Sequence, residues 1–362
     1  MRLAQGAESD PAGRESPDDL RRRLTPFPVP PDAVDFSSVP QSELRLYGLP
    51  PRPNAASQPL LRRIWDKAFA RRLTLVRYVY DEKRIRAARY RPMSRQKTEL
   101  AAAASRYESS SNWSGAYITA NSSRHFVQIW GSWCIPGNLQ KPPGLFQGPL
   151  DIPYICSNWI GLDGQRRYVD SSLPQIGTQS ELISDGTTVA EAWTQWWESN
   201  DPHTRPLPLG LEVHPGDEVL CVITAIDTRS VVMVIVNLTS LHAMAVLATA
   251  PSVEMPDGHT VVPEIEGATA EWILERPRVL GKTMRYNFPD FGQSEFHDCV
   301  AIAADVVDIY ALFGGAQQVL LGERLIRMFD VLPNPPRTAL IAMPEKLSDT
   351  SLRVKYGGFG LP

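Results

Sequence analysis

The sequence predicts an all-β protein, an antiparallel sandwich or barrel, from about residue 111 onward. Short β-branched and aromatic runs follow one another there, and turn residues such as the Pro-Gly-Asp tripeptide at 215–217 separate them. No segment with helical apolar spacing lies between most of the runs, which disfavours a parallel βαβ sheet. The runs are HFVQIWGSWCI at 125–135, CSNWIGL at 156–162, DEVLCVITAI at 217–226, SVVMVIVNLT at 230–239 and TAEWILE at 269–275.

The length of 362 residues allows one large β domain with an appendage, or two ordinary domains. A hydrophobic content of 43% and a charged content of 21% are ordinary for a soluble globular protein. No stretch approaches the roughly 18 apolar residues of a membrane span, so no membrane partner is expected. The N-terminus lacks the apolar run of roughly 7 to 15 residues that a secretory signal needs, so export by the general route is not predicted and the localisation stays open.

The first 110 residues differ from the rest in charge and texture. Residues 1–110 hold 21 Lys or Arg and 13 Asp or Glu, a net charge of +8, whereas residues 111–362 hold 16 and 27, a net charge of −11. Proline-rich pieces at 25–32 and 49–54 predict extended linker. Apolar residues at three- and four-residue spacing predict one basic amphipathic helix near 59–80. The chain therefore divides into a basic N-terminal extension and a β domain.

The extension has several possible roles. Packing of its helix on the main domain is favoured over contact with a membrane surface or nucleic acid, because no aromatic-basic RNA motif or recognition-helix pattern accompanies it. The opposite charges of the two parts also predict a pro-segment or clamp over an acidic cleft, held by attraction that weakens as carboxylates protonate. The alternative is a disordered or independently packed extension that is unrelated to activity.

Several familiar catalytic motifs are missing from the sequence. It has no GxSxG elbow, no HExxH, no Walker-type GxxxxGK[ST] and no GxGxxG after a strand. Six scattered histidines and four cysteines show no metal-ligand spacing, so neither a metal nor a cofactor is expected. Buried free thiols are expected at Cys134, Cys156, Cys221 and Cys299, with a bridge between Cys134 and Cys156 as the alternative in an oxidising compartment.

Two strand-like runs carry polar groups among aromatic residues. Strand alternation puts Trp193, Gln195 and Trp197 on one face, which predicts either a groove or the aromatic core of a sandwich. Alternation also puts Glu271 opposite Trp272. A carboxylate in such surroundings lies either on a solvated face or in a cleft that perturbs its pKa, and the residues alone favour the solvated face.

The ordered motifs of the β domain resemble those of the eqolisins, the glutamic peptidases of fungi and bacteria, and the chain is similar to a bacterial-type member. Singly these motifs are weak, but their order and spacing together are specific. The resemblance implies a two-sheet antiparallel jelly-roll sandwich of concanavalin-like type. The motifs are NWSGAY (112–117), GSWCIP (131–136), NWIGLDG (158–164), LPQIG (173–177), AWTQWW (192–197), PGDEV (215–219), NLT (237–239), TAEWILE (269–275), DFGQSEFHDC (290–299) and LSDTSLRVKY (347–356).

The resemblance also implies which residues act. The catalytic glutamate of the family falls on Glu271, and the catalytic glutamine falls on Gln175. Trp193, Asp163 and Trp159 fall on supporting or substrate-binding positions of the family motifs.

Three positions depart from the family pattern. Gln195, counted with the substrate-binding positions, stands where the family motif has an acid, Ile176 replaces a threonine and Thr269 replaces an asparagine. Losing a carboxylate beside the pair is expected to shift the pH optimum or weaken substrate positioning, but it leaves both catalytic groups in place.

The resemblance implies an acid-acting, pepstatin-insensitive endopeptidase with polypeptide substrates, expected to be a monomer. Glu271 would activate a water molecule and Gln175 would donate to the oxyanion, with no covalent intermediate. Two alternatives stay open. One is a carbohydrate-binding or glycoside-hydrolysing sandwich with Glu198 and Glu271 as its carboxylates. The other is a catalytically silent homologue that only binds peptides.

Overall fold

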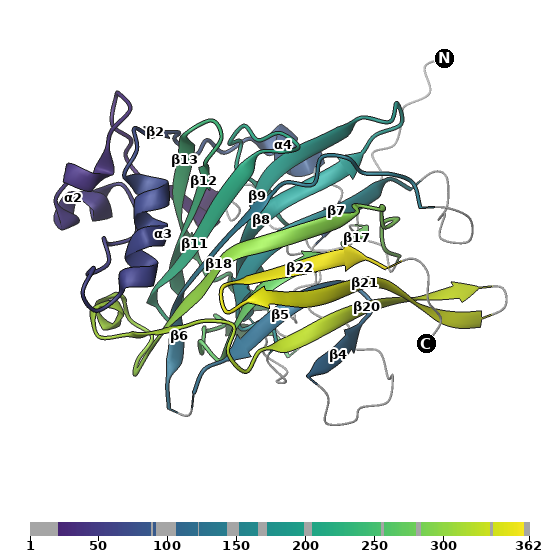
Figure 1. The fold of residues 1–362 in the computed structure, drawn as a ribbon. Helices are drawn as coiled ribbons and strands as arrows, with labels where there is room; N and C mark the ends of the chain where they lie inside the picture. Colours follow the sequence, from purple (N-terminus) through teal and green to yellow (C-terminus); the bar gives the residue numbers. More distant parts are fainter. Residues whose placement is uncertain are drawn as a thin grey trace, which may run out of the picture.

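The computed structural model describes residues 21–87, 90–91, 106–121, 123–142, 152–165, 172–198, 205–254, 257–279, 284–333 and 336–357. Antiparallel strands dominate this part of the chain, so the predicted all-β class is confirmed. The α-helices of the described residues lie in the N-terminal extension (Figure 1). They are α2 (Gln41–Leu46), α3 (Pro59–Phe69) and α4 (Glu82–Ala87), and the 3-10 turns are η1 (Phe36–Ser38) and η3 (Ile309–Phe313).

The first of two sheets, the inner sheet, is antiparallel throughout. Its strands follow the order β10, β9, β8, β7, β16, β5 and β20, so β16 is paired on both sides. The strands are β10 (Leu207–Pro208), β9 (Thr188–Glu198), β8 (Ser172–Leu182), β7 (Tyr154–Leu162), β16 (Thr269–Glu275), β5 (Trp113–Thr119) and β20 (Arg324–Pro333).

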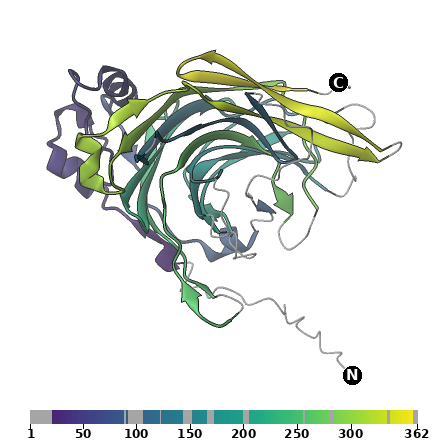
Figure 2. The same cartoon turned by 90° about the horizontal axis from the view of Figure 1, so that it is seen from below.

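The second sheet, the outer sheet, curves around the first, and Figure 2 shows the two layers end-on. Its order is β13, β12, β11, β6, β18 and β22, and β21 pairs with both β22 and β20. The two sheets are therefore joined along one edge. The strands are β13 (His242–Thr249), β12 (Ser230–Asn237), β11 (Glu218–Asp227), β6 (His125–Cys134), β18 (Gln293–Ala304), β22 (Ser351–Tyr356) and β21 (Pro336–Ser348).

Short strands complete the described structure at the edges and in the connections. They are β1 (Leu24–Pro26), β2 (Thr74–Leu75), β3 (Tyr90–Arg91), β4 (Tyr107–Ser110), β14 (Val253–Glu254), β15 (Thr260–Val261), β17 (Arg278–Val279) and β19 (Ala316–Gln318).

The main hydrophobic core fills the space between the two sheets. Strand alternation sends Ile160, Ile176 and Trp272 of the inner sheet into it, where they meet side chains of the outer sheet such as Ile223. The Trp272 indole N–H donates to the backbone oxygen of Trp130 at 2.7 Å, which ties strand β16 to the opposite sheet. The register of β16 is therefore fixed by a polar contact as well as by packing.

A second core lies on the other face of the outer sheet, under the N-terminal extension. Ile64, Trp65 and Phe69 of α3 are buried there against the sheet, and the Phe69 ring meets Trp130 edge-on at 6.4 Å. The predicted packing of the amphipathic helix on the main domain is confirmed. Figure 1 shows α2 and α3 together at the side of the outer sheet.

Two predictions for the extension need correction. The helix ends at Phe69 and does not reach residue 80, because the following segment pairs with the sheet: the Thr74 N–H donates to Leu241 at 3.0 Å. The proline-rich pieces are extended, but they are packed and not free linker. Leu24–Pro26 pairs with β13, and the Pro50 carbonyl accepts from the Trp65 indole at 3.0 Å.

The four cysteines are free thiols, so no bridge joins Cys134 to Cys156. Cys156, Cys221 and Cys299 are buried, as predicted, but Cys134 is exposed because it is the last residue of β6. None of the helices in the described part of the chain is long and apolar enough to cross a lipid bilayer.

The close pairing of β7 with β8 predicts a strong effect of Gly177→Ala. A Cβ atom at Gly177 would lie 2.1 Å from the Asn158 oxygen and 2.6 Å from the Trp159 Cβ. We expect a loss of about 1–3 kcal/mol in the free energy of unfolding, measured by urea denaturation. The control is Gly314→Ala, where a Cβ meets no atom within 4 Å and the expected change is within about 0.5 kcal/mol. Equal midpoints for both variants would contradict this interpretation of the strand contact.

Candidate active site

One row of residues crosses the inner sheet, and its side chains lie on the face away from the main core. The register pairs Glu271 with Gly161, Gly161 with Gln175, and Gln175 with Gln195. Directly paired residues point to the same face of a sheet, so the structure brings the two predicted catalytic residues to one face. Neighbouring strands lie about 4.8 Å apart, so the backbones at Glu271 and Gln175 are about 10 Å apart.

A glycine occupies the position between the two predicted catalytic residues. A Cβ atom at Gly161 would lie 2.7 Å from the Leu173 Cδ1 and 3.0 Å from the Trp159 Cζ3. The Leu173 and Trp159 side chains occupy the space that a side chain at Gly161 would need, so this position between Glu271 and Gln175 accepts only a glycine without rearrangement. Sequence reasoning assigned no role to Gly161, because its place in the row follows only from the register.

Aromatic side chains surround this row on the same face. Trp193 and Trp197 belong to this aromatic cluster, whereas Trp196 lies in the core between the sheets, as the predicted alternation requires. Trp113 and Trp159 meet edge-on at 4.9 Å. The cluster consists of Trp113, Tyr117, Ile152, Ile155, Trp159, Leu173, Trp193, Trp197, Ile273, Tyr286 and Ile326.

The two predicted supporting tryptophans are held by hydrogen bonds. The Trp159 indole N–H donates to the Glu275 Oε2 at 2.9 Å, and the Trp193 indole N–H donates to the Ser157 Oγ at 3.0 Å. Glu275 was missed by the sequence reasoning, although alternation along β16 places it on the same face as Glu271. Its buried carboxylate fixes the orientation of an aromatic side chain beside the row.

Glu271 is completely buried, so the predicted solvated face is wrong. No well-aligned hydrogen bond reaches either carboxylate oxygen from the described residues. Burial raises the pKa of Glu271 well above its ordinary value of 4.5, and the nearby charge of Asp163 raises it further. The Thr269 side chain and the backbone N–H groups of Gln165 and Gly164 offset only part of this rise. Burial therefore favours the protonated form of this carboxyl group.

Gln195 holds the amide of Gln175 in one orientation. The Gln175 Nε2 donates to the Gln195 Oε1 at 2.9 Å, and the Gln175 Oε1 has no partner among the described residues. A carboxylate at position 195 would accept the same hydrogen bond, which explains why an amide can stand there without disturbing the row. Ile176 points into the core between the sheets, so that departure from the family pattern does not touch the pair.

Asp163 holds the backbone segment that leads into strand β16. Its buried carboxylate accepts hydrogen bonds from the backbone N–H groups of Glu266 at 2.7 Å, Gly267 at 2.9 Å and Ala268 at 2.6 Å. Burial raises the pKa of Asp163, and these hydrogen bonds lower it. Because the three amides lie directly before β16, Asp163 fixes the entry to the strand that carries Glu271.

The glycosidase alternative needs Glu198 and Glu271 as a pair, but these two residues lie on opposite faces of the inner sheet. Glu198 accepts from the Trp196 indole at 3.1 Å, and both residues lie on the face opposite Trp193 and Glu271. Two carboxylates on opposite faces of one sheet cannot flank the same glycosidic bond. Within the described ranges, no group of three or more His, Cys, Asp or Glu residues could hold a metal ion.

Comparison with known proteins places the chain in a family. The family model described as the peptidase A4 family matches residues 111–311, which is more than half of the chain. The protein belongs to the peptidase A4 family. It is a peptide hydrolase of the glutamic type, as the motif resemblance implies.

Several solved structures of glutamic peptidases are similar to this A4 family member. Scytalido-glutamic peptidase with a transition-state analogue inhibitor has 18% identity and a TM-score of 0.47, over 68% of this chain and 98% of that one. SCP-B, an eqolisin in complex with the tripeptide Ala-Ile-His, has 18% identity and a TM-score of 0.45 over the same shares. Aspergilloglutamic peptidase from Aspergillus niger has 20% identity and a TM-score of 0.42, over 56% and 99%. No curated protein sequence matches the chain.

The buried carboxyl group predicts a pH-dependent effect of Glu271→Gln on stability. With a pKa raised by folding, wild-type stability is fully present below the ordinary value of 4.5 and is lost as the pH rises toward the folded-state value. Glutamine does not ionise, so the stability of the variant does not fall over this pH range. Its midpoint of thermal unfolding should therefore match that of the wild type near pH 4 and exceed it by about 3 °C or more at pH 7.

The control for this measurement is Glu212→Gln, which changes an exposed carboxylate on the same chain. A difference between Glu271→Gln and the wild type that is constant from pH 4 to pH 7 would show that the buried carboxyl group carries no such penalty.

Proposed function

We propose that the protein is an acid-acting endopeptidase in which Glu271 and Gln175 are the catalytic pair. The observation that carries the proposal is the row on the inner sheet, where a carboxyl group and an oriented amide lie on the same face, on either side of Gly161. The surrounding tryptophans are buried in this structure and would form an apolar wall of the site once a peptide enters. Membership of the peptidase A4 family supplies the reaction, the hydrolysis of a peptide bond.

The proposed reaction has two proton transfers and no covalent intermediate. The ionised carboxylate of Glu271 takes a proton from a water molecule as the water oxygen bonds to the scissile carbonyl carbon. The negative charge that develops on the carbonyl oxygen accepts a hydrogen bond from the Gln175 amide. Glu271 then returns the proton to the nitrogen of the leaving amine as the carbon–nitrogen bond breaks.

Acid action follows from the chemistry of the row. Entry of water and peptide would solvate Glu271 and bring its pKa down toward its ordinary value, which makes the base form available in mild acid. Gln175 and Gln195 are amides and do not titrate, so the oxyanion donor and its acceptor stay unchanged at low pH. The pH profile is then governed by the carboxyl groups of Glu271 and Asp163.

The dyad is tested by three substitutions. Glu271→Gln and Gln175→Ala should each lower the rate of hydrolysis of a denatured protein by at least about 100-fold without unfolding the domain. Glu198→Gln, which changes a buried glutamate on the opposite face, should retain activity. Rates are measured at several pH values, with circular dichroism to check the fold. Full activity of either dyad variant would overturn the mechanism, and an inactive wild type that still binds peptide would favour the silent homologue.

We also propose that the end of the extension restricts access to the site. Strand β3 (Tyr90–Arg91) pairs with β17 (Arg278–Val279), and Val279 packs against the aromatic cluster. Residues 21–75 lie mainly against the outer sheet, so the predicted clamp over the cleft is wrong for them, whereas α4 contacts β10 at the edge of the inner sheet. Restriction of the site is therefore assigned to the β3 end alone.

Acid should relieve this restriction. After incubation of the full-length protein near pH 4, we expect higher activity and a new N-terminus downstream of residue 87, identified by sequencing. A catalytically dead Glu271→Gln chain is the control that separates self-cleavage from contaminating proteases. A chain that stays intact and equally active before and after acid treatment would rule out inhibition by the extension.

A further inference from the structure

We propose that residues 21–75 are a permanent third layer of the protein, retained in its working form and not removable as a pro-segment. This attachment is independent of the proposed peptidase function. Three features indicate it: the apolar character of the outer sheet, the residues that cover this sheet, and the sheet edge that the extension closes.

The part of the outer sheet formed by β11, β12 and β13 is apolar on both faces. Along β12, Val231, Met233 and Ile235 lie in the core between the sheets, while Val232, Val234 and Val236 lie in the second core. A sheet that faces water on one side alternates apolar with polar residues, and strands with continuous apolar runs are typical of sheets covered on both sides. A two-layer sandwich would leave the second set of valines in water, so this sheet requires a third layer.

The extension supplies the cover with large aromatic side chains. Trp65, Phe69 and Phe36 have no exposed surface, and they belong to one cluster with Trp130 of β6. Removing the layer would expose these valines and Trp130 as one contiguous apolar patch, of the kind that drives aggregation in monomeric proteins. The interface is therefore hydrophobic core, and it does not resemble a charge-held clamp.

The extension also closes an edge of the outer sheet. Leu24–Pro26 pairs with Val246–Ala248 of β13, and Thr74–Leu75 pairs with the start of the same strand. Without β1 and β2, the backbone groups of β13 would form an open edge available to other chains. The same segment thus protects both the face and the edge of one sheet.

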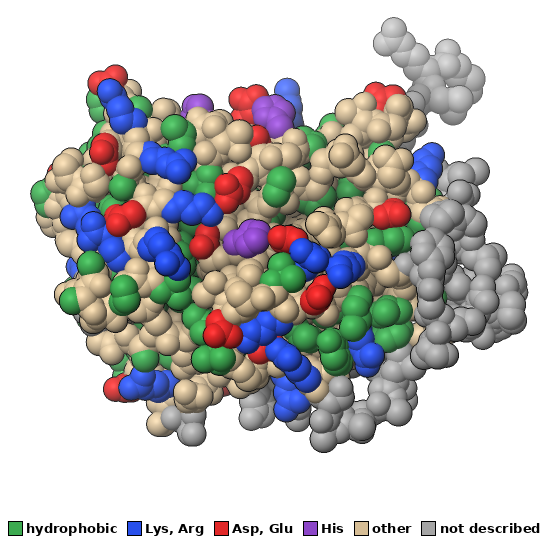
Figure 3. All heavy atoms as spheres, viewed as in Figure 1, with side chains coloured by type: hydrophobic (Ala, Val, Ile, Leu, Met, Phe, Trp, Pro, Cys, Tyr) green, Lys and Arg blue, Asp and Glu red, His purple; other side chains and the backbone are tan. Residues whose placement is uncertain are grey.

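Charge contributes less than packing to the attachment. Lys67 of α3 lies 2.7 Å from the Glu218 Oε1 and 3.0 Å from the Asp298 Oδ2, and all three side chains are partly exposed. Ion pairs at such positions contribute little to stability. In Figure 3, acidic and basic side chains are interspersed over this side of the molecule and form no single-sign patch. Acid that protonates the carboxylates therefore leaves the apolar attachment intact.

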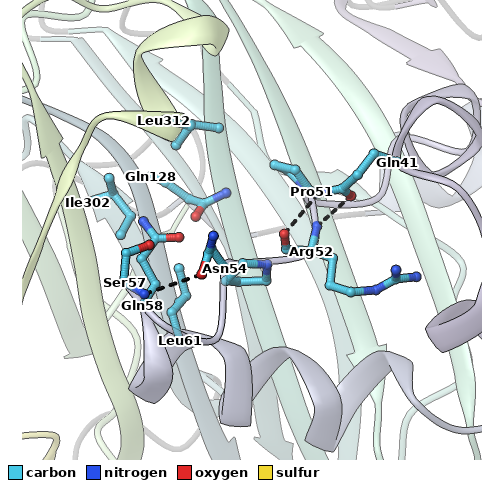
Figure 4. Close-up of a pocket in the computed structure, with 11 residues that line it drawn as sticks. Gln41, Pro51, Arg52, Asn54, Ser57, Gln58, Leu61, Gln128, Ile302 and Leu312 are labelled. Carbon is cyan, nitrogen blue, oxygen red and sulfur yellow. Dashed lines mark hydrogen bonds between the residues drawn. The ribbon is translucent and has the colours of Figure 1, made fainter.

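One cavity of about 440 Å³ interrupts this interface (Figure 4). Its walls come from both parts of the chain: Asn54 and Leu61 from the extension, and Gln128, Ile302 and Leu312 from the β domain. The Gln128 amide donates to the Thr224 Oγ1 at 2.9 Å and so keeps its place in the sheet. Because neither part encloses this space alone, the cavity exists only while the layer is attached.

The decisive experiment cuts the chain and asks whether the pieces separate. A recognition sequence for a site-specific protease is inserted between residues 91 and 106 of the full-length protein, and the purified protein is cleaved at pH 7 and held at pH 4. We expect both pieces to co-elute in gel filtration at both pH values and to unfold in one transition. Release of the N-terminal piece in native buffer, whether or not the remainder stays soluble, would overturn the proposal.

A second measurement tests the same layer without cleavage. Trp65→Ala should lower the midpoint of thermal unfolding by roughly 5–15 °C, and the milder Trp65→Phe should lower it by less. The matched control is Leu46→Ala on α2, whose side chain is 62% exposed and should change the midpoint by less than about 2 °C. Equal midpoints for Trp65→Ala and the control would contradict the proposal. Neither readout requires enzymatic activity, so a failure of the proposed function would leave this test intact.

Discussion

The structure depends on one constraint: strand β16 must be buried on both faces and still carry a carboxyl group. Trp272 on one face locks the strand to the outer sheet through the backbone of Trp130, and Glu271 on the other face lies among tryptophans. Pairing with β5 and β7 on either side leaves the strand no freedom to slip, because a shift of one residue would exchange the two faces. The network around Asp163 then fixes where the strand begins.

The buried carboxyl group is a local violation of good packing that the rest of the fold must offset. A buried carboxyl group without a well-aligned hydrogen bond destabilises a protein, and such sites persist where the surrounding structure determines them firmly. Here the surroundings are extensive, because apolar clusters lie between the sheets, over the inner sheet and over the outer sheet. Proteins commonly break local rules at functional sites, and Glu271 fits that pattern.

Much of this arrangement could be predicted from the sequence, and the failures have physical causes. Alternation gave the correct faces for Trp193 and Trp196, because the period of a strand is a local property. Alternation could not predict that the Glu271 face of β16 is buried, because the residues that bury it come from distant parts of the sequence. The end of α3 was misplaced for a similar reason: Val76 continues the helix-like apolar spacing, but its N–H donates to Ala243, on a strand far along the chain. The role of Gly161 needed the register of three strands.

The third layer has a consequence for how the protein is made. Its contacts span almost the whole chain: the Leu61 N–H donates to the Gln317 side chain, 256 residues later, and Lys67 meets Asp298, 231 residues later. At about 5–20 residues per second, the ribosome takes roughly 10–50 s to synthesise that interval. During this time the apolar face of α3 has been made but its full docking surface has not. The layer can therefore be secured only after the segments that carry Asp298 and Gln317 have been made, and contacts of such high sequence separation are slow to form. The layer is thus synthesised before the β domain, yet it is among the last parts to be secured.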